Sequence, residues 1–310
     1  MEITEKKAVF SMSDTESVKA VNFRTWQQKL REYKHQPLSL FLKLLMLLAI
    51  LLSAGMLVLL IGSILIKGIP SLIAYFPSIF SWTYTSENVS MTPAIVNTVI
   101  MTILSLLISV PIGIFAAIYL AEYAKRGSRL VKIIRITAET LSGIPSIVYG
   151  LFGYLLFVIA LGLGYSLISG VVTLSIMILP LIIRTTEEAL LSVPDSYREG
   201  SFGLGAGRLR TVFKVVLPSA VPGILAGVIL AIGRIVGESA ALIFTAGTYA
   251  AVPDGLTDSA RTLSVHMYAL LSEGLYTEQA YAAAVVLLVL VIGINALSGF
   301  AAKKLLRSGN

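Results

Sequence analysis

Two charged side chains stand in the middle of one long apolar run of the sequence. Arg234 and Glu238 lie within the run from Ala220 to Ala246, and a helix rising 1.5 Å per residue would place Arg234 roughly 21 Å from its start. A spacing of four residues puts both side chains on one helix face, close enough to pair. A guanidinium matches carboxylate or phosphate geometry, and Glu238 would orient it and keep an empty site nearly neutral. The pair predicts a pathway for an anion; the alternative is a buried ion pair that only fixes helix packing.

The composition of the chain identifies the surroundings of that pair as lipid. Hydrophobic residues make up 56% of the 310 residues and charged residues only 13%, against roughly 25% charged in soluble domains. Too little polar surface remains for a soluble enzyme, a disordered chain or a fibre. Lipid rather than nucleic acid then accounts for the net charge of +7. An arginine at the bilayer centre costs at least ~2.5–3.5 kcal/mol, so Arg234 must face protein or water.

The chain lacks most residues that catalysis or metal binding needs. It has no Cys and only two His, which excludes disulfides, thiolate metal sites, iron–sulfur clusters and a His-rich metal centre. It contains no HExxH, no G-x-S-x-G and no Gly-Lys dipeptide, so the nucleotide-binding loop G-x-x-x-x-G-K-[ST] is absent. We therefore predict no catalytic residue, no metal site and no cofactor in this chain. If ATP drives its activity, another polypeptide binds the nucleotide.

Six apolar runs are long enough to cross a bilayer, whose core of about 30 Å needs roughly 20 residues of helix. The runs are continuous rather than alternating, which favours helices over the strands of a barrel. The prediction is an all-α polytopic membrane protein with six transmembrane helices, at Leu40–Ile66, Pro93–Leu120, Leu141–Ala160, Leu167–Ile183, Ala220–Ala246 and Ala280–Ala302.

The basic residues between these runs predict the orientation. Of the 24 Lys and Arg residues, all but three lie in the N-terminal stretch up to Lys43, in the loops after spans two and four, or at the C-terminus. Lys67 and Arg261 lie on the other side, and Arg234 lies within span five. Because cytoplasmic loops carry the excess of Lys and Arg, we predict a plasma or inner membrane protein with both termini cytoplasmic. Residues 1–37 then form a solvated cytoplasmic tail, with lipid or partner binding as the alternative.

The polar segment between spans four and five, residues 184–218, carries signals of two short helices. Ser196-x-x-Glu199 has the form of a capping box, in which the Ser hydroxyl accepts the Glu N–H and the Glu carboxylate accepts the Ser N–H. We expect the first helix to begin there and to end at a glycine cluster, since glycine disfavours helix. The cluster consists of Gly203, Gly205 and Gly207.

A second helix is predicted after the glycines because apolar and basic side chains separate onto opposite faces. Pro218 and Pro222 are expected to stop this helix and to mark the entry into span five. The segment is either an amphipathic hairpin on the membrane surface or a docking element for a cytoplasmic partner, and its pattern alone leaves both open. The apolar face holds Leu209, Val212, Phe213 and Val216, and the basic face holds Arg208, Arg210 and Lys214.

The spacing within this segment resembles the "EAA" loop of ABC importer permeases, whose pattern is E-A-A-x3-G-x9-I-x-L-P. The matching residues are Glu199, Gly205, Leu217 and Pro218, with Gly200 and Ser201 in place of the two alanines and Val215 in place of Ile. In that family the loop inserts a short helix into a groove on the ATPase subunit. The resemblance thus implies that residues 184–218, Ser196 included, form a docking loop for an ATPase.

Span three contains a proline that predicts a kink and a small-residue face that predicts close helix packing. The kink is expected at Pro145, and the face at Ser146-x-x-x-Gly150. Residues 142–153 and 233–247 together look like the phosphate-specific transport permeases, as does Arg184-Thr-Thr-Glu at the end of span four. That resemblance implies a pathway role for Arg184 beside Arg234 and Glu238.

The stretch 233–247 is more similar to the PstA subunits of that system, where Gly-Glu-Thr-Ala-Pro-Leu-Leu-Phe-Thr is usual, than to their PstC partners. Ser239 and Ala241 depart from the pattern, which leaves the choice between the two subunits open. The resemblance implies a type-I ABC importer permease fold, with a first transmembrane helix at 38–67 and a five-helix core at 93–302. It also implies partners: a PstC-like permease, two ATPase subunits that bind ATP and Mg, and an extracytoplasmic phosphate-binding protein.

The leading hypothesis is therefore the permease subunit of an ATP-driven importer of inorganic phosphate. A PstC-like subunit of the same system is one alternative, and a self-sufficient anion transporter or channel is another. Such a carrier has no need of an ATPase-docking loop, so the pattern from Glu199 to Pro218 separates the two classes. The outer loop from Thr248 to Gln279 is expected to face the binding protein, with a short amphipathic segment at Leu263–Tyr268.

Overall fold

The computed structural model describes residues 37–85, 87–125 and 127–308, which form helices and connecting loops without a strand. The predicted N-terminal tail lies outside these residues except for Pro37. The chain divides into two compact units, Met1–Leu60 and Ile61–Asn310.

The described part of the first unit is the beginning of helix α2, Pro37–Ala74, whose side chains from Leu38 to Leu60 are all exposed. This stretch is almost entirely apolar, and an exposed apolar helix of such length fits a lipid environment. The final turns of α2 belong to the second unit. There the ammonium of Lys67 lies 5.1 Å from the centre of the Tyr281 ring.

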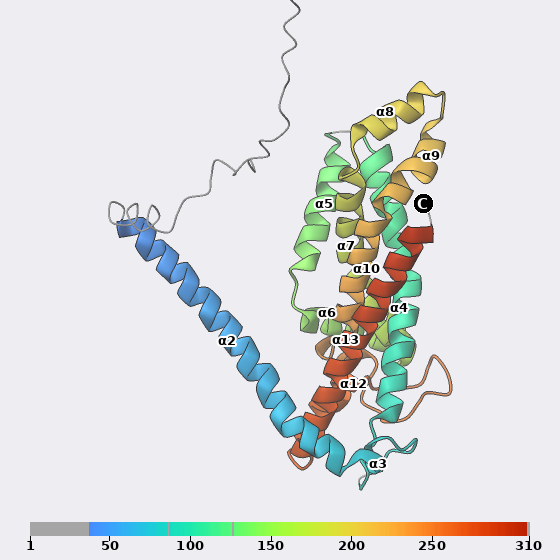
Figure 1. The fold of residues 1–310 in the computed structure, drawn as a ribbon. Coiled ribbons are helices and arrows are strands. Elements are labelled where there is room, and N and C mark those ends of the chain that lie inside the picture. Colours follow the sequence, from blue (N-terminus) through green and yellow to red (C-terminus); the bar gives the residue numbers. More distant parts are fainter. Residues whose placement is uncertain (1–36, 86, 126, 309–310) are drawn as a thin grey trace, which may run out of the picture. The chain divides into compact units, whose positions relative to one another are not determined.

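The second unit is a bundle of long helices with short helices at both of its ends (Figure 1). After α2 the helices are α3 (Phe76–Ile79), α4 (Thr92–Ile118), η1 (Tyr119–Tyr123), α5 (Arg129–Ser142), α6 (Ser146–Gly153), η2 (Tyr154–Ala160), α7 (Leu167–Leu191), α8 (Asp195–Gly203), α9 (Arg208–Thr211), η3 (Val212–Val216), α10 (Leu217–Val236), α11 (Ala240–Thr245), α12 (Leu263–Glu273) and α13 (Thr277–Ser308). The three elements η1, η2 and η3 are π-helical turns.

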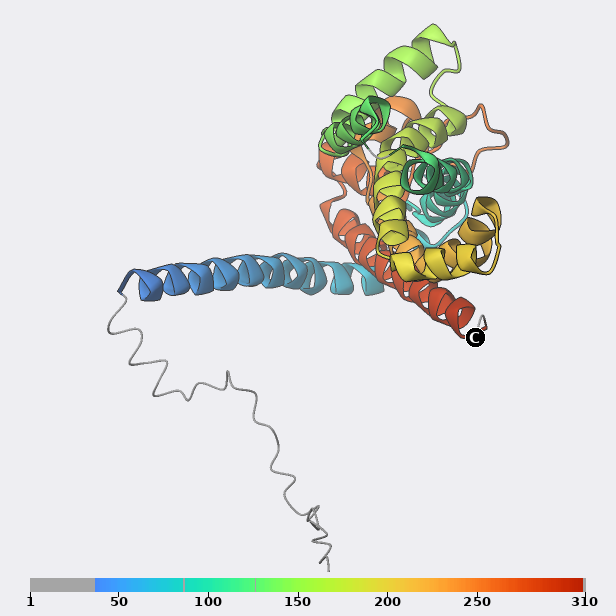
Figure 2. The ribbon, with the colours of Figure 1, turned by 90° about the horizontal axis from the view of Figure 1, so that it is seen from above.

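Helix α7 is the centre of this bundle, with α4 and α10 packed along it (Figures 1 and 2). Its most apolar window is 61% buried, whereas the corresponding windows of α4 and of α13 are 28% and 22% buried. Glycines allow the close approach: a Cβ on Gly113 of α4 would lie 2.6 Å from Ile182. The outer helices therefore expose their apolar faces, as expected for helices that contact lipid.

The predicted spans are all found in helices, and five helices within the described residues are long and apolar enough to cross a membrane. The predicted third span, Leu141–Ala160, is instead a broken pair. Helix α5 ends at Ser142 and α6 begins at Ser146, with a bend of 101° between α5 and the helix from Ser146 to Ala160. Pro145 lies in the break, because proline has no N–H to continue the helical ladder.

Other predicted boundaries also differ from the helix ends; the first helix, for example, continues past Ile66 to Ala74. The fourth span continues past Ile183 to Leu191. The fifth ends at Val236, and a separate helix, α11, begins at Ala240. Pro218 does not stop a helix, since the chain is helical without interruption from Arg208 to Val236. The π-helical turn η3 lies just before Pro218, with only Leu217 between them.

Candidate functional site

Arg234 lies in the last turn of α10 with a half-buried side chain. Together with Asn295 of α13 it lines a cavity of about 460 Å³, whose remaining walls are apolar. Within the described residues the guanidinium has no ion pair, and the Oδ1 atom of Asn295 is buried without a hydrogen-bond partner. A cation and an amide with unused hydrogen-bonding capacity therefore face one cavity between α10 and α13.

The predicted ion pair between Arg234 and Glu238 is absent. Helix α10 ends at Val236, so the two residues do not share a helix face. The buried Glu238 carboxylate instead accepts a hydrogen bond from the Ala241 N–H, with Oε1 and N separated by 3.0 Å. It satisfies an amide at the start of α11, and an acidic group at a helix N-terminus is favoured by the helix dipole. The charge of Arg234 is thus not neutralised by its sequence neighbour.

Two residues that the sequence reasoning missed lie close to Arg234. Tyr149 of α6 is within Coulombic range of the guanidinium, and its hydroxyl donates a hydrogen bond of 2.9 Å to the Leu141 carbonyl. That bond crosses the break between α5 and α6. Asn295 could have been found, because a lone amide inside the apolar run Ala280–Ala302 marks a helix face that avoids lipid.

Arg184 does not share the cavity of Arg234. Its Nε donates to Oε1 of Glu188 at 2.9 Å, and both side chains are more than half exposed. Arg184 lines a different cavity of about 220 Å³ between α5 and α7. The pathway role expected for Arg184 thus stays a prediction. In the structure Arg184 forms an exposed ion pair with Glu188.

Pro145 lies in the break between α5 and α6, Ser146 is the first residue of α6, and Gly150 lies within that helix. A Cβ on Gly150 would lie 2.8 Å from the Cα of Ala241 and 3.1 Å from the Ala240 carbonyl oxygen. Only glycine permits this approach, since backbone atoms cannot move aside as side chains do. The broken third span is therefore packed directly against α11, the helix that Glu238 caps.

The docking segment, residues 184–218, contains the end of α7 and the short helices α8 and α9. The predicted capping box was wrong, because α8 begins one residue before Ser196, with Pro194 at the N-cap and no side-chain cap. Ser196 and Glu199 are both exposed. The helix ends at Gly203 as predicted, and the turn that follows has Gly205 at φ +81°, a conformation that L-residues avoid.

The predicted apolar face of the second helix is buried only in part. Val212 and Val216 are buried, whereas Leu209 and Phe213 are 66% and 39% exposed. Leu204, in the glycine turn, is 91% exposed. Exposed apolar side chains next to charged ones are typical of a surface that another protein covers.

A buried ion pair fixes α8 to the bundle. The Arg198 guanidinium donates from Nη2 and Nε to Oε1 of Glu122, at 2.6 and 3.1 Å, and the two side chains are only 14% and 8% exposed. The same guanidinium donates to the carbonyls of Leu190 and Val193 at 2.8 and 2.7 Å. Arg208 adds a hydrogen bond to the Glu122 carbonyl and lies 5.2 Å from the Tyr123 ring centre. Sequence spacing gave no sign of this contact across 76 residues.

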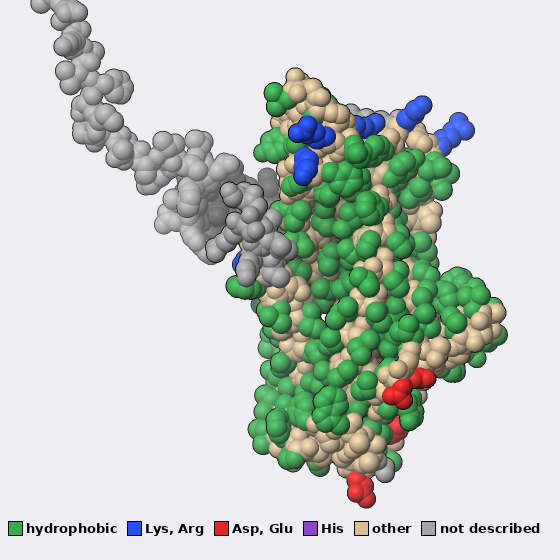
Figure 3. Space-filling model, turned by 90° about the vertical axis from the view of Figure 1, so that its right-hand side faces the viewer, with side chains coloured by type: hydrophobic (Ala, Val, Ile, Leu, Met, Phe, Trp, Pro, Cys, Tyr) green, Lys and Arg blue, Asp and Glu red, His purple; other side chains and the backbone are tan. Residues whose placement is uncertain are grey.

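A second ion pair stabilises the same end of the bundle. Nη2 of Arg135 on α5 lies 2.5 Å from Oε1 of Glu187 on α7, and Nε donates to the same oxygen at 2.8 Å. The face shown in Figure 3 has its Lys and Arg side chains at the end with the docking segment and its Asp and Glu side chains at the opposite end. On this face the two ends therefore differ in the sign of their surface charge.

Comparison with known proteins assigns the chain to a family. Residues 109–307 match the family model described as "Binding-protein-dependent transport system inner membrane component". The chain belongs to this family. It is therefore a multi-pass protein of the inner membrane.

Two relatives show how far the similarity reaches. A probable ABC transporter permease protein, YqgI of Bacillus subtilis, is 48% identical over 130 residues, which is 42% of this chain and 44% of the relative. The phosphate transport system permease protein PstA 2 of Mycobacterium tuberculosis is 41% identical over 167 residues, which is 54% of this chain and 55% of the relative. The matched regions thus span about half the length of these relatives.

Solved structures identify the fold as that of the type-I ABC importer permeases. A chain of a bacterial ABC transporter for the acidic polysaccharide alginate superposes with a TM-score of 0.62 at 18% identity, covering 89% of this chain and 99% of that one. A chain of the MetNI methionine transporter in an inward-facing conformation gives a TM-score of 0.53 at 21% identity, covering 71% and 94%. The predicted fold class is thereby confirmed.

The ion pair between Arg198 and Glu122 predicts how α8 is held. Replacing Arg198 by Met leaves a buried carboxylate unpaired, which costs about 3–5 kcal/mol. We expect α8 to detach, so that backbone amides of residues 195–203 exchange with deuterium markedly faster while the bundle keeps its protection. The matched control is Arg210→Met at an exposed arginine of the same segment. Equal exchange in the two variants would show that the pair does not hold α8.

Proposed function

We propose that this chain is the permease subunit of an ATP-driven phosphate importer, forming the phosphate pathway and coupling to a separate ATPase through residues 184–218. The observation that carries the proposal is the half-buried guanidinium of Arg234, which lines a cavity between α10 and α13 without an acidic partner. Relatives named as phosphate transport system permeases support phosphate as the substrate.

The chemistry of the cavity suits a small oxyanion. A guanidinium presents two parallel N–H groups to a phosphate, and low local polarity strengthens such charge-assisted bonds. The Nδ2 group of Asn295 on α13 could donate a further hydrogen bond to the anion, whereas its Oδ1 can only accept. Because Glu238 caps α11 rather than pairing with Arg234, the cavity keeps a net positive charge and attracts an anion. Glu238 then acts indirectly, by fixing the turn that follows Arg234.

The docking segment provides the coupling. The exposed side of α8 and of the glycine turn, with Glu199 and Leu204, would lie in the groove of an ATPase subunit. The opposite side is tied by Arg198 to Glu122 in η1 and to the end of α7. A movement of the ATPase that displaces α8 would therefore move the ends of two membrane helices together. A self-sufficient carrier would gain nothing from this arrangement.

The proposed assembly has two different permeases, of which this chain is PstA-like and its partner PstC-like, with two ATPase subunits and an extracytoplasmic phosphate-binding protein. ATP and Mg belong to the ATPase subunits, and this chain is a non-catalytic subunit. The end with the docking segment and both termini are placed in the cytoplasm, where its excess of Lys and Arg fits the positive-inside rule.

Arg234→Gln tests the substrate pathway. Since Arg234 has no ion pair among the residues that the structure describes, its loss leaves no buried carboxylate there unpaired, and the variant should assemble normally. A hydrogen bond to a charged group is worth about 1.5–3 kcal/mol, so phosphate uptake should fall by about 10- to 150-fold. The measurement is uptake of labelled phosphate per assembled complex, with Arg234→Lys as the charge-retaining control. Near-normal uptake by Arg234→Gln would show that Arg234 is not part of the phosphate pathway.

Glu199→Lys tests the docking role. The residue is exposed, so the variant should insert and fold as the unaltered chain does, while a lysine on the docking surface weakens the contact with the ATPase. We expect reduced co-purification of the ATPase, or ATP hydrolysis no longer stimulated by substrate. Glu87→Lys is the matched control, because it makes the same charge change outside the docking segment. Wild-type uptake by Glu199→Lys at wild-type expression would contradict the proposal.

The orientation is tested by cysteine labelling, for which the natural chain offers a Cys-free background. A Cys at Gly255 should react with an impermeant maleimide on intact cells, and a Cys at Gly207 should react only after the membrane is opened. Neither glycine has an atom within 3.4 Å of an added Cβ, so both sites tolerate the change. The reverse labelling pattern would overturn the proposed topology.

A further inference from the structure

A second arginine without an acidic partner, Arg261, lies between α11 and α12, on the far side of the second unit from the docking segment. Its side chain is only 4% exposed, and its Nε and Nη2 atoms are shielded from solvent without a hydrogen-bond acceptor in the described residues. Burying a charged group is costly unless an opposite charge or an acceptor compensates it. The resting structure supplies neither to Arg261.

Hydrogen bonds hold the backbone around Arg261, and the ring of Tyr84 contacts its guanidinium. Its N–H donates to the Tyr249 carbonyl at 3.1 Å, and its own carbonyl accepts from Nδ2 of Asn97 at 3.2 Å. The same Asn97 amide also donates to the Ala251 carbonyl at 3.0 Å. One side chain of α4 thus binds two separate positions of the loop between α11 and α12. On one face, the ring centre of Tyr84 lies 4.5 Å from the Arg261 Cζ atom, in a cation–π contact.

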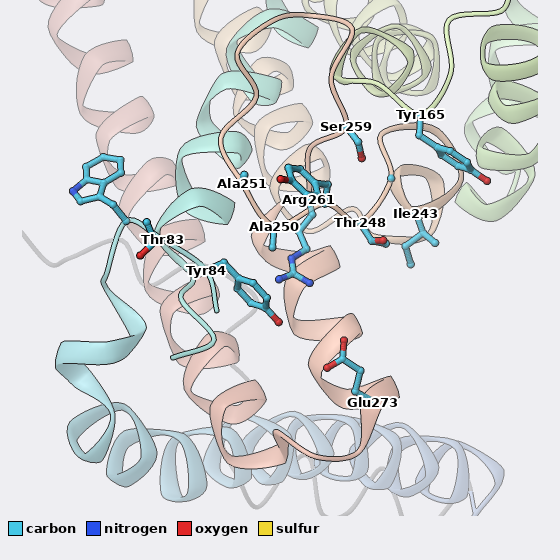
Figure 4. Close-up of a pocket in the computed structure, with 13 residues that line it drawn as sticks. Thr83, Tyr84, Tyr165, Ile243, Thr248, Ala250, Ala251, Ser259, Arg261 and Glu273 are labelled. Carbon is cyan, nitrogen blue, oxygen red and sulfur yellow. The ribbon is translucent and has the colours of Figure 1, made fainter. Parts of the chain in front are cut away.

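The Arg261 side chain lines a cavity of about 900 Å³ (Figure 4). The hydroxyls of Thr83 and Thr248 line the same cavity and make no hydrogen bond among the described residues. Glu273 of α12 is also at its wall, but it forms no ion pair with Arg261 within the described part of the chain. The cavity therefore combines one guanidinium, the hydroxyls of Thr83 and Thr248, and the carboxylate of Glu273.

A neighbouring histidine adds no charge to this region. His266 of α12 packs edge-on against the Tyr84 ring, with ring centres 6.1 Å apart. Burial and the Arg261 charge lower the pKa of His266 to about 3. The imidazole is therefore neutral at physiological pH, and Arg261 is the cation to which an anion in the cavity would respond.

We infer that the cavity around Arg261 binds a small inorganic oxyanion of phosphate size. This binding site, called the outer station below, is separate from the site at Arg234. The inference rests on the proposed function for the identity of the ion, but its residues and its end of the bundle are different. Tyr84 covers one face of the guanidinium, and Nη1, unlike Nε and Nη2, is not among its solvent-shielded nitrogens and is the atom left for an acceptor. An anion there would compensate the buried charge that the chain leaves unpaired.

The test is binding of labelled inorganic phosphate to the purified chain in lipid nanodiscs, measured by equilibrium dialysis. Arg261→Gln should weaken the binding by about 10-fold or more, which is the loss of one charge-assisted hydrogen bond. Arg234→Gln should leave this binding component in place. Unchanged phosphate binding in Arg261→Gln, or loss of all binding in Arg234→Gln alone, would overturn the outer station.

A second variant keeps the test valid if Arg261→Gln does not fold. Thr248→Asp places a carboxylate on the wall of the same cavity, where it would pair with Arg261 and compete with an anion. We expect it to abolish the phosphate binding lost in Arg261→Gln and to raise the unfolding temperature, while its neutral control Thr248→Asn does neither. Phosphate binding that persists in Thr248→Asp would contradict the inference.

The outcome separates this inference from the proposed function. If the wild-type complex takes up phosphate but the purified chain binds none through Arg261, the outer station fails and the proposed function stands. If Arg261→Gln instead loses its contact with the phosphate-binding protein and keeps phosphate binding, Arg261 is a protein contact and the inference is wrong. If the wild-type complex moves no phosphate, the proposed function fails whatever dialysis shows.

Discussion

The buried ion pair between Arg198 and Glu122 is the contact on which the organisation of the docking end depends. Helix α8 has no buried residue of its own, so it cannot be held by apolar packing. One guanidinium replaces that packing by binding the Glu122 carboxylate and the carbonyls of Leu190 and Val193. Three elements, η1, the end of α7 and α8, thus meet at a single side chain. Because the pair is shielded from water, its strength depends little on the salt concentration outside.

Five arginines among the described residues of the second unit fall into two groups that differ in their partners. Arg135, Arg184 and Arg198, near the docking end, each pair with a carboxylate. Arg234 and Arg261 pair with none in the described residues, yet both are at least half buried and line cavities. A cation that folding leaves uncompensated can be compensated by a ligand instead. We therefore assign anion binding to the second group and a role in holding helices together to the first.

Much of the fold could be predicted, because apolar run length, Pro145 and the glycine cluster act locally. What failed was set by contacts distant in sequence or by competing local signals. The helix through Arg234 was expected to continue, but Gly150 of α6 lets α11 pack so closely that a separate short helix forms, with Glu238 as its cap. Pro194 took the N-cap position expected for Ser196. The setting of Arg261 was invisible, since it is made by Tyr84 and Asn97 from elsewhere in the chain.

The π-helical turn η3 lies within the docking segment, in the uninterrupted helix that continues to Arg234. Such a turn holds an additional residue compared with an α-helical turn. Because each residue of an α-helix advances the chain by about 100° around the axis, tightening the turn would rotate everything beyond it by about that angle. A change of winding at Val212–Val216, directly before α10, would therefore alter the direction in which Arg234 points without breaking the helix.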